Sequence, residues 1–581
     1  MNAERLLQYF DRISDAPDAI PRLRRFILDL AVRGKLVEQN PNDEPAAELL
    51  KRIEVKKAQL AKKVKALPEV TDDEKPFDAP KGWEWVRIRQ VTIDRGQAVP
   101  QTDFTYIDVT AINKERGCIA EPKILSASEA PSRARKLVQK GDVIYSCVRP
   151  YLLNIAVVDA EIEPSPIAST AFAVMYGFGL VLPQYLWITL RSPFMVECVE
   201  TCMRGQAYPA INDSDFALLP IPLPPLGEQH RIVAKVDELM TLCDQLEAAK
   251  TECEQSRDRL VAASLHRMNQ PSDAEEANTS DAFREHACFV FNHLPRLTTR
   301  LEHIKQLRQS ILNLAVRGKL VPQDPNDEPA SELLKRIQAE KIQLIKQGTI
   351  KRQLPVVPIK VDELLSRVPD SWKWVRLRDL LLRDSQNGYS KKPDDAPNGI
   401  PILRISAGTA RRDGIVAEEE HKLIGGVSVS QQELYRLQPG DLLACRFNGN
   451  RSFVGRLSLY TGYLGIRPIY PDKLIRLRLL SQFVLPKLVM YFAESKDVRT
   501  DIESYCATTV GNWGISASNL KEVKIPLPPL TEQHRIVAKV DELMSICDQL
   551  EAHLTTTEAD SRLLLEAVLH EALAPALEET A

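Results

Sequence analysis

Several kinds of sequence signal are missing from this chain of 581 residues. It has no run of about 18 apolar residues, which a membrane-spanning helix would need. Its N-terminus, MNAERLLQYFDRISD, is charged and lacks the apolar core of a secretory signal. Its ten cysteines include no CxxC pair, and Cys198 and Cys202 lie four residues apart. We therefore expect free thiols in a reducing cytoplasm, no zinc site and no contact with a membrane.

Catalytic motifs are missing as well. No GxxxxGK(S/T) phosphate loop occurs, since Arg33-Gly34-Lys35-Leu36 lacks both the first glycine and the hydroxyl residue. No GxGxxG follows a predicted strand, and neither HExxH nor a nucleophile elbow is found. The Asn-Pro-Pro-aromatic tetrad, which amino-methyltransferases use on a flipped base, is also absent. The sequence thus predicts a protein that is not an enzyme and that holds no metal or cofactor of its own.

What the chain does contain is a pair of internal repeats. Residues 221–248 (IPLPPLGEQHRIVAKVDELMTLCDQLEA) return at 525–552 with 25 of 28 residues identical. Residues 27–53 return at 311–337 with 23 of 27 identical. Between these repeats lie two inserts that no longer resemble each other. One molecule therefore carries two nearly identical scaffolds with different inserts, which suits a protein that recognises two different targets.

Composition sets broad limits. The apolar fraction of 44% and the charged fraction of 27% are those of a soluble globular protein, and the length predicts three to five folding units. The net charge of −3 argues neither for nor against nucleic acid. Locally, Pro131–Tyr151 has five positive residues against one Asp, whereas Glu228–Asp258 has eight acids against four bases. Basic inserts on an acidic scaffold would present basic surfaces on a nearly neutral protein.

Periodicity predicts helices and strands in each half. Residues 1–66 and 300–366 are expected to be mostly helical, with Gly34 as a C-terminal cap and Asp43 as the N-cap of a second helix. Apolar alternation predicts strands at 83–88 and 372–377. Further strands are expected at Thr105–Val109, Asp142–Tyr145, Ile155–Val158, Ile402–Ile405, Asp441–Ala444 and Phe453–Leu459, and helices at Gln184–Cys202 and Ser481–Ser495. Each insert is therefore predicted to be a mixed α/β domain of about 140 residues.

A heptad-like apolar seam follows each IPLPPL segment. Its members are Ile232, Val236, Leu239, Cys243 and Leu246 in the first copy, and Ile536, Val540, Leu543, Cys547 and Leu550 in the second. Such a seam needs a partner helix, and its own duplicate is the obvious one. The predicted fold class is α+β: two mixed α/β domains joined by long helices that form an antiparallel intramolecular coiled coil with pseudo-two-fold symmetry.

The predicted segments follow from these signals. They are a helical segment at 1–75, a recognition domain at 76–224, a coiled-coil helix at 225–268, a linker at 269–299, a second helical segment at 300–366, a second recognition domain at 367–528, and a second coiled-coil helix with a tail at 529–581.

Polar and aromatic residues in the inserts are candidates for DNA contact, because Arg pairs with guanine, Asn with adenine and Lys with phosphate. The candidates are Arg133, Arg135, Lys136, Arg149, Tyr151, Asn154, Tyr208, Arg404, Arg446, Asn448, Asn450, Arg451 and Trp513. Solvated surface turns or buried aromatic plugs explain many of them equally well. For Glu228 and Glu532 we expect helix capping rather than catalysis. For PLPPL we expect a stiff connector rather than a ligand of a proline-binding module.

The repeated IPLPPLxEQHRIVAKVDELM and ILxLAVRGKLVxQxPNDEPAxELLKRI segments around two unlike inserts resemble the specificity (S) subunits of type I restriction–modification systems. The inserts share only the WxWVR entry, the Gly141-Asp142 and Gly440-Asp441 strands, and the exits at Ile211 and Ile515 with that family. Unlike the shorter members, this chain has a helical segment ahead of both inserts.

The resemblance implies a non-catalytic subunit that reads a bipartite double-stranded DNA target, one half with each insert. It also implies that two modification subunits, which carry S-adenosylmethionine and methylate adenine N6, dock on the helices. Restriction subunits would add ATP-driven, Mg²⁺-dependent translocation and cleavage in the cytoplasm. The alternatives are a coiled-coil scaffold with two protein-binding domains, which would lack basic loops, and a lone nuclease or methyltransferase, which would need catalytic motifs.

Overall fold

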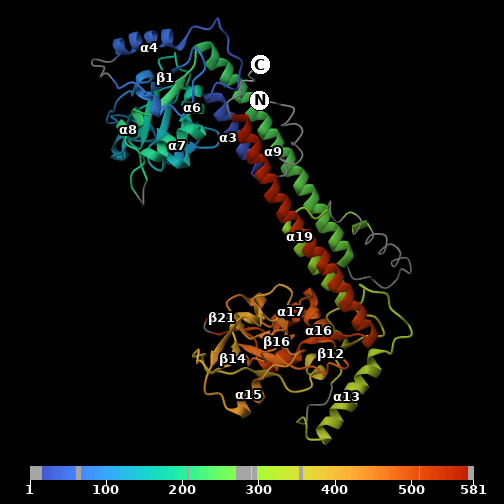
Figure 1. Ribbon diagram of the computed structural model, residues 1–581. Helices are drawn as coiled ribbons and strands as arrows, with labels where there is room; N and C mark the ends of the chain where they lie inside the picture. Colours follow the sequence, from blue (N-terminus) through green and yellow to red (C-terminus); the bar gives the residue numbers. More distant parts are fainter. Residues whose placement is uncertain are drawn as a thin grey trace. The chain divides into compact units, whose positions relative to one another are not determined.

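The computed structural model describes residues 16, 18–60, 67–205, 209–269, 289–290, 293, 297–351, 357–509 and 511–573. The chain divides into two units, residues 1–253 with 557–581 and residues 254–556. Each unit combines helices with one mixed α/β domain, as the sequence predicts (Figure 1). Each unit is described by itself below.

A pair of helices precedes each domain: α3 (Ala19–Val32) and α4 (Ala46–Leu60) in unit 1, α12 (Leu301–Val316) and α13 (Ala330–Lys346) in unit 2. Gly34 has a φ of +65° and lets the chain turn after α3, as predicted. The prediction for Asp43 is wrong. It lies three residues before α4, and its carboxylate forms an ion pair with Arg231 at 2.7 Å instead of capping the helix.

The domain of unit 1 is built on two small sheets with strand orders β5-β2-β9-β6 and β10-β7-β8. Its elements are β1 (Glu84–Arg87), α5 (Ile88–Val91), β2 (Phe104–Ile107), β3 (Ile112–Asn113), β4 (Cys118–Ile119), β5 (Lys123–Leu125), β6 (Ala134–Leu137), β7 (Asp142–Ser146), β8 (Ile155–Val157), β9 (Pro166–Ser169), β10 (Phe172–Tyr176), α6 (Pro183–Arg191), α7 (Pro193–Cys202), α8 (Asp213–Ala217) and β11 (Pro220–Leu223). The single helix predicted over Gln184–Cys202 is two helices, because Pro193 has no backbone N–H and the Ser192 side chain caps a new start.

The domain of unit 2 repeats this plan with different strands, and its main sheet has the order β13-β19-β16-β18. Its elements are β12 (Lys373–Arg376), α14 (Leu377–Leu380), β13 (Gln386–Asn387), β14 (Ile400–Leu403), β15 (His421–Ile424), α15 (Val429–Tyr435), β16 (Leu442–Cys445), β17 (Phe447–Asn448), β18 (Leu457–Leu459), β19 (Leu474–Leu477), α16 (Pro486–Ala493), α17 (Lys496–Ser504), β20 (Ala507–Thr509), β21 (Asn512–Gly514), α18 (Ala517–Glu522) and β22 (Lys524–Leu527). The strand predicted over Phe453–Leu459 is shorter, because Arg451–Phe453 form a 3-10 turn.

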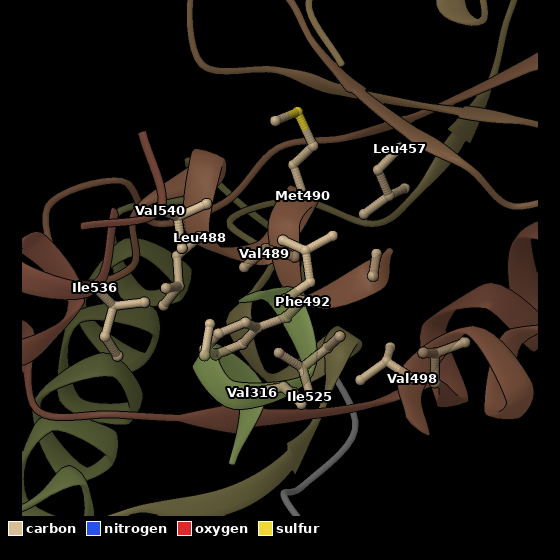
Figure 2. Close-up of a cluster of buried hydrophobic side chains, with 14 of the residues drawn as sticks. Val316, Leu457, Leu488, Val489, Met490, Phe492, Val498, Ile525, Ile536 and Val540 are labelled. Atoms are coloured by element: carbon tan, nitrogen blue, oxygen red, sulfur yellow. The ribbon is translucent and has the colours of Figure 1, made fainter. Parts of the chain in front are cut away.

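The core of unit 2 joins the scaffold to the domain. Figure 2 shows Phe492 of α16 among Val316 of α12, Ile525 of β22 and Val498 of α17. Ile536 and Val540 from the start of the next helix belong to the same buried cluster. Helix, domain and scaffold therefore share one apolar core, so that none of them is free to move as a separate body within the unit.

The first three residues of each IPLPPL segment belong to a strand, β11 or β22, and the last residue begins the long helix that follows. β11 pairs antiparallel with β1, setting Trp85 opposite Pro222, and β22 pairs with β12 in the same register, setting Trp374 opposite Pro526. The segment from Pro220 to Pro225 is buried throughout. A proline-binding module could not reach it, and the repeated sequence is explained by this pairing.

Two helices of 44 residues each, α9 (Leu226–Asn269) and α19 (Leu530–Leu573), follow the domains. In unit 2, the shorter helix α12 runs antiparallel to α19. Arg308 in α12 binds Asp548, whereas Gln323, beyond the end of α12, binds Glu532 at the start of α19.

The same helix α12 runs parallel to the end of α9. Arg300, just before α12, binds Asp258 of α9 at 2.9 Å. Further along α12, Ser310 accepts a hydrogen bond at 2.9 Å from Asn269, the last residue of α9. Since α12 is antiparallel to α19 and parallel to α9, the two long helices are antiparallel to each other within this unit. This part of the predicted fold is confirmed.

Unit 1 repeats the arrangement around α3. Arg24 binds Asp244 of α9 at 2.6 Å, which is the counterpart of Arg308 with Asp548. Arg22 lies 3.8 Å from Glu566 at the end of α19. Each unit therefore holds parts of both long helices, bound to a common shorter helix.

This third helix changes the predicted role of the seam. Ile232, Val236 and Cys243 are buried in a cluster whose members all lie between Ile20 and Cys243, including Ile27 and Leu28 of α3. The second-copy residues Ile536, Val540, Leu543 and Cys547 are buried with α12 and the domain of unit 2. Leu239 and Leu550 are half-buried, and Leu246 is 43% exposed. The apolar seam therefore packs on the short helix and the domain of its own half, and in unit 2 the same buried cluster includes Val261, Leu265 and Met268 of α9.

A buried glutamate stands at the start of each long helix. Glu228 accepts hydrogen bonds from the Trp83 indole at 2.9 Å and from Gln39 at 2.6 Å. Glu532 accepts the same pair of bonds, from Trp372 at 2.8 Å and from Gln323. Burial raises the pKa of both carboxyls, against the lowering effect of these donors. The glutamates are structural, though as buried acceptors rather than only as capping charges.

Trp83→Phe should lower the free energy of unfolding of unit 1 by about 1–3 kcal/mol, because it removes a donor from a buried carboxylate. Trp187→Phe is a matched control in the same unit, since the buried Trp187 indole N–H has no hydrogen-bond partner. Urea unfolding followed by circular dichroism would measure both. Equal losses in the two variants would show that the Glu228 bond contributes nothing specific.

Leu543→Asp should destabilise unit 2 by about 3 kcal/mol or more, because Leu543 is only 6% exposed and would bury an unpaired charge. Leu563→Asp makes the same change on the same helix at a position that is 66% exposed, and it should be nearly neutral. Thermal unfolding would separate them. Similar melting temperatures would contradict the packing described for α19.

Candidate nucleic-acid interface

The strand that follows each Gly-Asp motif leads to the same place in both domains. In unit 1, Val148 bridges Ala210 just after β7, and the Ile211 N–H donates to the Cys147 carbonyl at 3.0 Å. In unit 2, Phe447 of β17 pairs with Gly514 of β21, and the Ile515 N–H donates to the Arg446 carbonyl at 3.0 Å. The edge formed by these segments, called the reading edge below, is thus equivalent in the two domains although its residues differ.

In unit 2 the reading edge carries cations stacked on aromatic rings. The Arg446 guanidinium lies 4.7 Å from the centre of the Phe447 ring, and the Lys473 ammonium lies 4.8 Å from the same centre. The Arg451 guanidinium lies 4.9 Å from the Trp513 ring centre. Such stacking holds long side chains in fixed directions while leaving charge near the surface.

Backbone contacts fix the two arginines further. Arg446 donates to the Asp472 carbonyl at 3.3 Å, and Arg451 donates to the Glu503 carbonyl at 2.8 Å. Between them, the Asn450 side chain accepts from the Ser452 N–H at 3.0 Å and shapes the turn. The structure therefore brings together five sequence-predicted residues. They are Arg446, Asn448, Asn450, Arg451 and Trp513.

Arg404 lies apart from these five. It follows β14, a strand that pairs with β15 and also bridges Ile469 through Ile402, and its N–H donates to the Glu420 carbonyl. The side chain is exposed.

In unit 1 the predicted residues are more scattered. Arg149 and Tyr151 are exposed at the reading edge, where the Arg149 N–H donates to the Pro209 carbonyl at 2.8 Å. Asn154 is half-buried and its carbonyl accepts from Ser146. Arg133 is exposed in the turn before β6. Tyr208 lies outside the described residues.

The structure contradicts the prediction that Lys136 contacts DNA. Its side chain is only 4% exposed and forms ion pairs with Asp94 at 2.8 Å and Asp213 at 2.7 Å. Strand β6 alternates, so Ala134 and Lys136 both face inward. Arg135 is half-buried and donates to the neighbouring Ala134 carbonyl. The basic run at 133–136 therefore offers Arg133, not three cations, to a ligand.

Sequence reasoning also missed residues at the reading edge. Phe447 was visible beside Arg446, but nothing in the sequence connected it to Lys473. The two meet because the Arg446 N–H donates to the Lys473 carbonyl at 2.8 Å, a pairing of distant segments. Lys473 is thus a third cation at this edge, beside Arg446 and Arg451, and only the fold reveals it.

Comparison with known proteins decides the family. A family model described as the type I restriction modification DNA specificity domain matches residues 80–253 and 369–557, more than half of the chain. This chain belongs to that family.

Curated relatives agree in length and identity. The chain is 32% identical to the type I restriction enzyme EcoEI specificity subunit of Escherichia coli over 570 residues, covering 95% of this chain and 94% of the relative. It is also 32% identical to the EcoAI specificity subunit of Escherichia coli over 584 residues, with the same coverage. The solved HsdS subunit from Thermoanaerobacter tengcongensis is 26% identical, covering 86% of this chain and 98% of its own, with a TM-score of 0.44.

The chain is therefore a type I specificity subunit with two DNA-recognition domains, one in each matched range. Specificity subunits are non-catalytic, bind DNA and assemble within type I complexes. In the described part of the chain, no helix is long and apolar enough to span a bilayer. Within the same residues, no cluster of three or more His, Cys, Asp or Glu side chains is placed to hold a metal ion.

Lys136→Ala should destabilise the first recognition domain by about 2 kcal/mol or more, because it leaves Asp94 and Asp213 without their buried partner. Arg133→Ala, three residues away and exposed, should change stability by less than about 0.5 kcal/mol. Thermal unfolding of the two variants measures the difference. If Lys136→Ala does not change the melting temperature, the ion pairs contribute nothing to stability, and Lys136 is again a candidate for DNA contact.

Proposed function

We propose that this specificity subunit reads a split DNA sequence, one half with each recognition domain. The observation that carries the proposal is that two unlike reading edges occupy the same position on two nearly identical scaffolds. Identical scaffolds would present the domains in equivalent ways, and unlike edges would recognise unlike half-sites. The antiparallel long helices would fix the gap between the halves.

In the second domain, Arg446, Asn448, Asn450 and Arg451 are the proposed base and phosphate contacts, with Trp513 as a stacking platform. Arginine stacked on an aromatic ring presents its donors in a fixed direction, as bidentate recognition of guanine requires. In the first domain the proposed contacts are Arg133, Arg149, Tyr151 and Asn154.

We further propose that two modification subunits dock on equivalent faces of α9 and α19. Several exposed positions are identical in the two helices, although no packing constraint fixes exposed residues. They are His230, Ala234, Glu238 and Gln245, with their counterparts His534, Ala538, Glu542 and Gln549. Leu242 and Ile546, 46% and 37% exposed, add a large apolar side chain to each face. An identical face on both helices suits two copies of one partner.

In this proposal the chemistry lies on other subunits. The modification subunits would carry S-adenosylmethionine and methylate adenine, and restriction subunits would bind ATP and Mg²⁺. This chain would supply position and sequence choice only.

A domain exchange tests the central proposal. The chain would be expressed with its modification partner, beside a version in which residues 92–210 come from an unrelated family member, and methylation would be mapped genome-wide. We expect a split motif with a fixed gap that changes in one half only. A continuous motif, or one that ignores the exchange, would favour a protein-binding scaffold.

Arg446→Ala should relax one base position of the second half-site and weaken binding by about 1–3 kcal/mol, if Arg446 contacts guanine. Arg446→Lys keeps the charge but loses the planar fork, so it should relax the same position while losing less affinity. Binding to a set of single-base variants of the target measures this. A loss that is uniform across all sequences would assign Arg446 to phosphate instead.

Leu242→Asp and Ile546→Asp test the docking faces. Each single variant should lower the number of bound modification subunits from two to one, and the double variant should bind none, because each face would serve one copy. Native mass spectrometry of the co-purified complex counts the copies. Leu563→Asp, which is exposed on α19 outside the repeated stretch, is the control. Two bound copies in the double variant would exclude these faces.

A further inference from the structure

The reading edge of the first domain carries an exposed apolar tip, residues 148–152. Val148 is 40% exposed, Tyr151 44% and Leu152 38%. Three large apolar or aromatic side chains thus face water within five residues, beside a core in which such residues are buried. Exposed apolar side chains that cluster are typical of interaction surfaces, whereas single ones are common on any protein.

The backbone holds this tip in an unusual conformation. Arg149 and Leu153, on either side of the short 3-10 turn Pro150–Leu152, both have left-handed φ values, 48° and 53°. Residues with a side chain rarely adopt such φ values, because they are energetically unfavourable. The conformation is fixed by hydrogen bonds from Arg149 to the Pro209 carbonyl and from Leu153 to the Pro150 carbonyl, both between 2.8 and 2.9 Å. The buried Pro150 anchors the turn from below. The turn is therefore held by backbone hydrogen bonds at both of its ends.

Cations surround the tip. The Arg149 side chain is exposed within it. Arg204 bridges Ala210, the same residue that bridges Val148; its side chain is 78% exposed and forms an ion pair with Asp215 at 3.1 Å. Arg133 is connected to the tip through the turn at Thr170 and Ala171. The Arg133 carbonyl accepts a hydrogen bond from the Thr170 N–H, and the Ala171 carbonyl accepts one from the N–H of Cys147, the residue before Val148. An apolar projection with arginines around it fits a ligand that has an apolar interior between two anionic edges, which describes the stacked bases of duplex DNA.

The second domain shows a different solution at the same position. There the counterpart of Val148 is Phe447, whose ring is covered by Arg446 and Lys473 rather than exposed. The two domains therefore do not share a mode of contact. Among the described residues at these two edges, only the first domain has an exposed apolar side chain at this position.

We propose that Tyr151 and Leu152 form a wedge that enters between neighbouring base pairs of the first half-site and unstacks them. Apolar wedges flanked by cations kink DNA in this way, and the energy needed depends on the base step that is opened. The first domain would then select its half-site partly by how easily one step unstacks. The inference rests on the proposed function, because it assumes that this domain contacts DNA.

The test uses the full subunit in complex with its modification partner, on duplexes of the motif found by methylation mapping. 2-Aminopurine is placed at successive positions of the first half-site. We expect a rise in fluorescence at one step with the wild-type chain, and its loss in Leu152→Ala and Tyr151→Ala together with about tenfold weaker binding or more. Tyr151→Phe should retain the rise. Ile124→Ala, at an apolar position of the same domain that is 67% exposed but away from the reading edge, is the matched control.

A second measurement separates wedging from simple contact. A mismatch at the responding step removes part of the stacking in advance, so it should tighten wild-type binding and leave the Leu152→Ala variant unaffected. If no position brightens even with the wild-type chain, although the tip variants bind more weakly, the wedge is wrong and DNA reading by this domain is unaffected. If the tip variants no longer bind the modification subunits, the wedge proposal is wrong and the tip contacts a protein subunit instead. A wild-type complex with no sequence preference would instead contradict the proposed function.

Discussion

The hydrogen bonds to the two buried glutamates are the constraint on which the rest of the structure depends. Glu228 joins Trp83 at the entrance of the domain, Gln39 in the loop after α3, and the first turn of α9. The next residue, Gln229, accepts from the Leu182 N–H at the start of α6. A buried carboxylate is costly unless its donors are present, so the unit is most stable when three segments distant in sequence meet there. Glu532 imposes the same requirement on unit 2.

Because the junction is fixed by a few residues, the inserts between them were able to diverge. The Gly-Asp motifs show where the common frame ends. Asp142 and Asp441 are both buried, and each accepts a backbone bond at 2.8 Å from the residue three positions earlier. Yet Asp142 pairs with Arg95, which precedes it, and Asp441 with Arg478, which follows it. The carboxylate position is shared, but its arginine comes from a different part of each insert.

The same division explains what sequence reasoning can predict. Repeats, periodicity and glycine placement predict the helices, the strands beside the tryptophans and the α+β class, because those signals are local. They fail for Asp43, which pairs with Arg231 far along the chain, and for the seam, whose partners include α3 and α12. The basic run at Arg133 looked like a binding surface, but charge alone does not reveal which residues of a strand point inward. Lys136 lies on the inward face, two residues after the buried Ala134.

The reading edges show why a duplicated frame does not produce a duplicated preference. In the second domain, aromatic rings hold cations in place, which suits recognition of polar base edges and phosphates. In the first domain, a strained turn exposes apolar side chains between arginines. The two edges begin at equivalent backbone hydrogen bonds, at Ile211 and Ile515. Geometry is therefore set by the repeated residues and chemistry by the unrepeated ones, so that either edge can change without disturbing the position of the other.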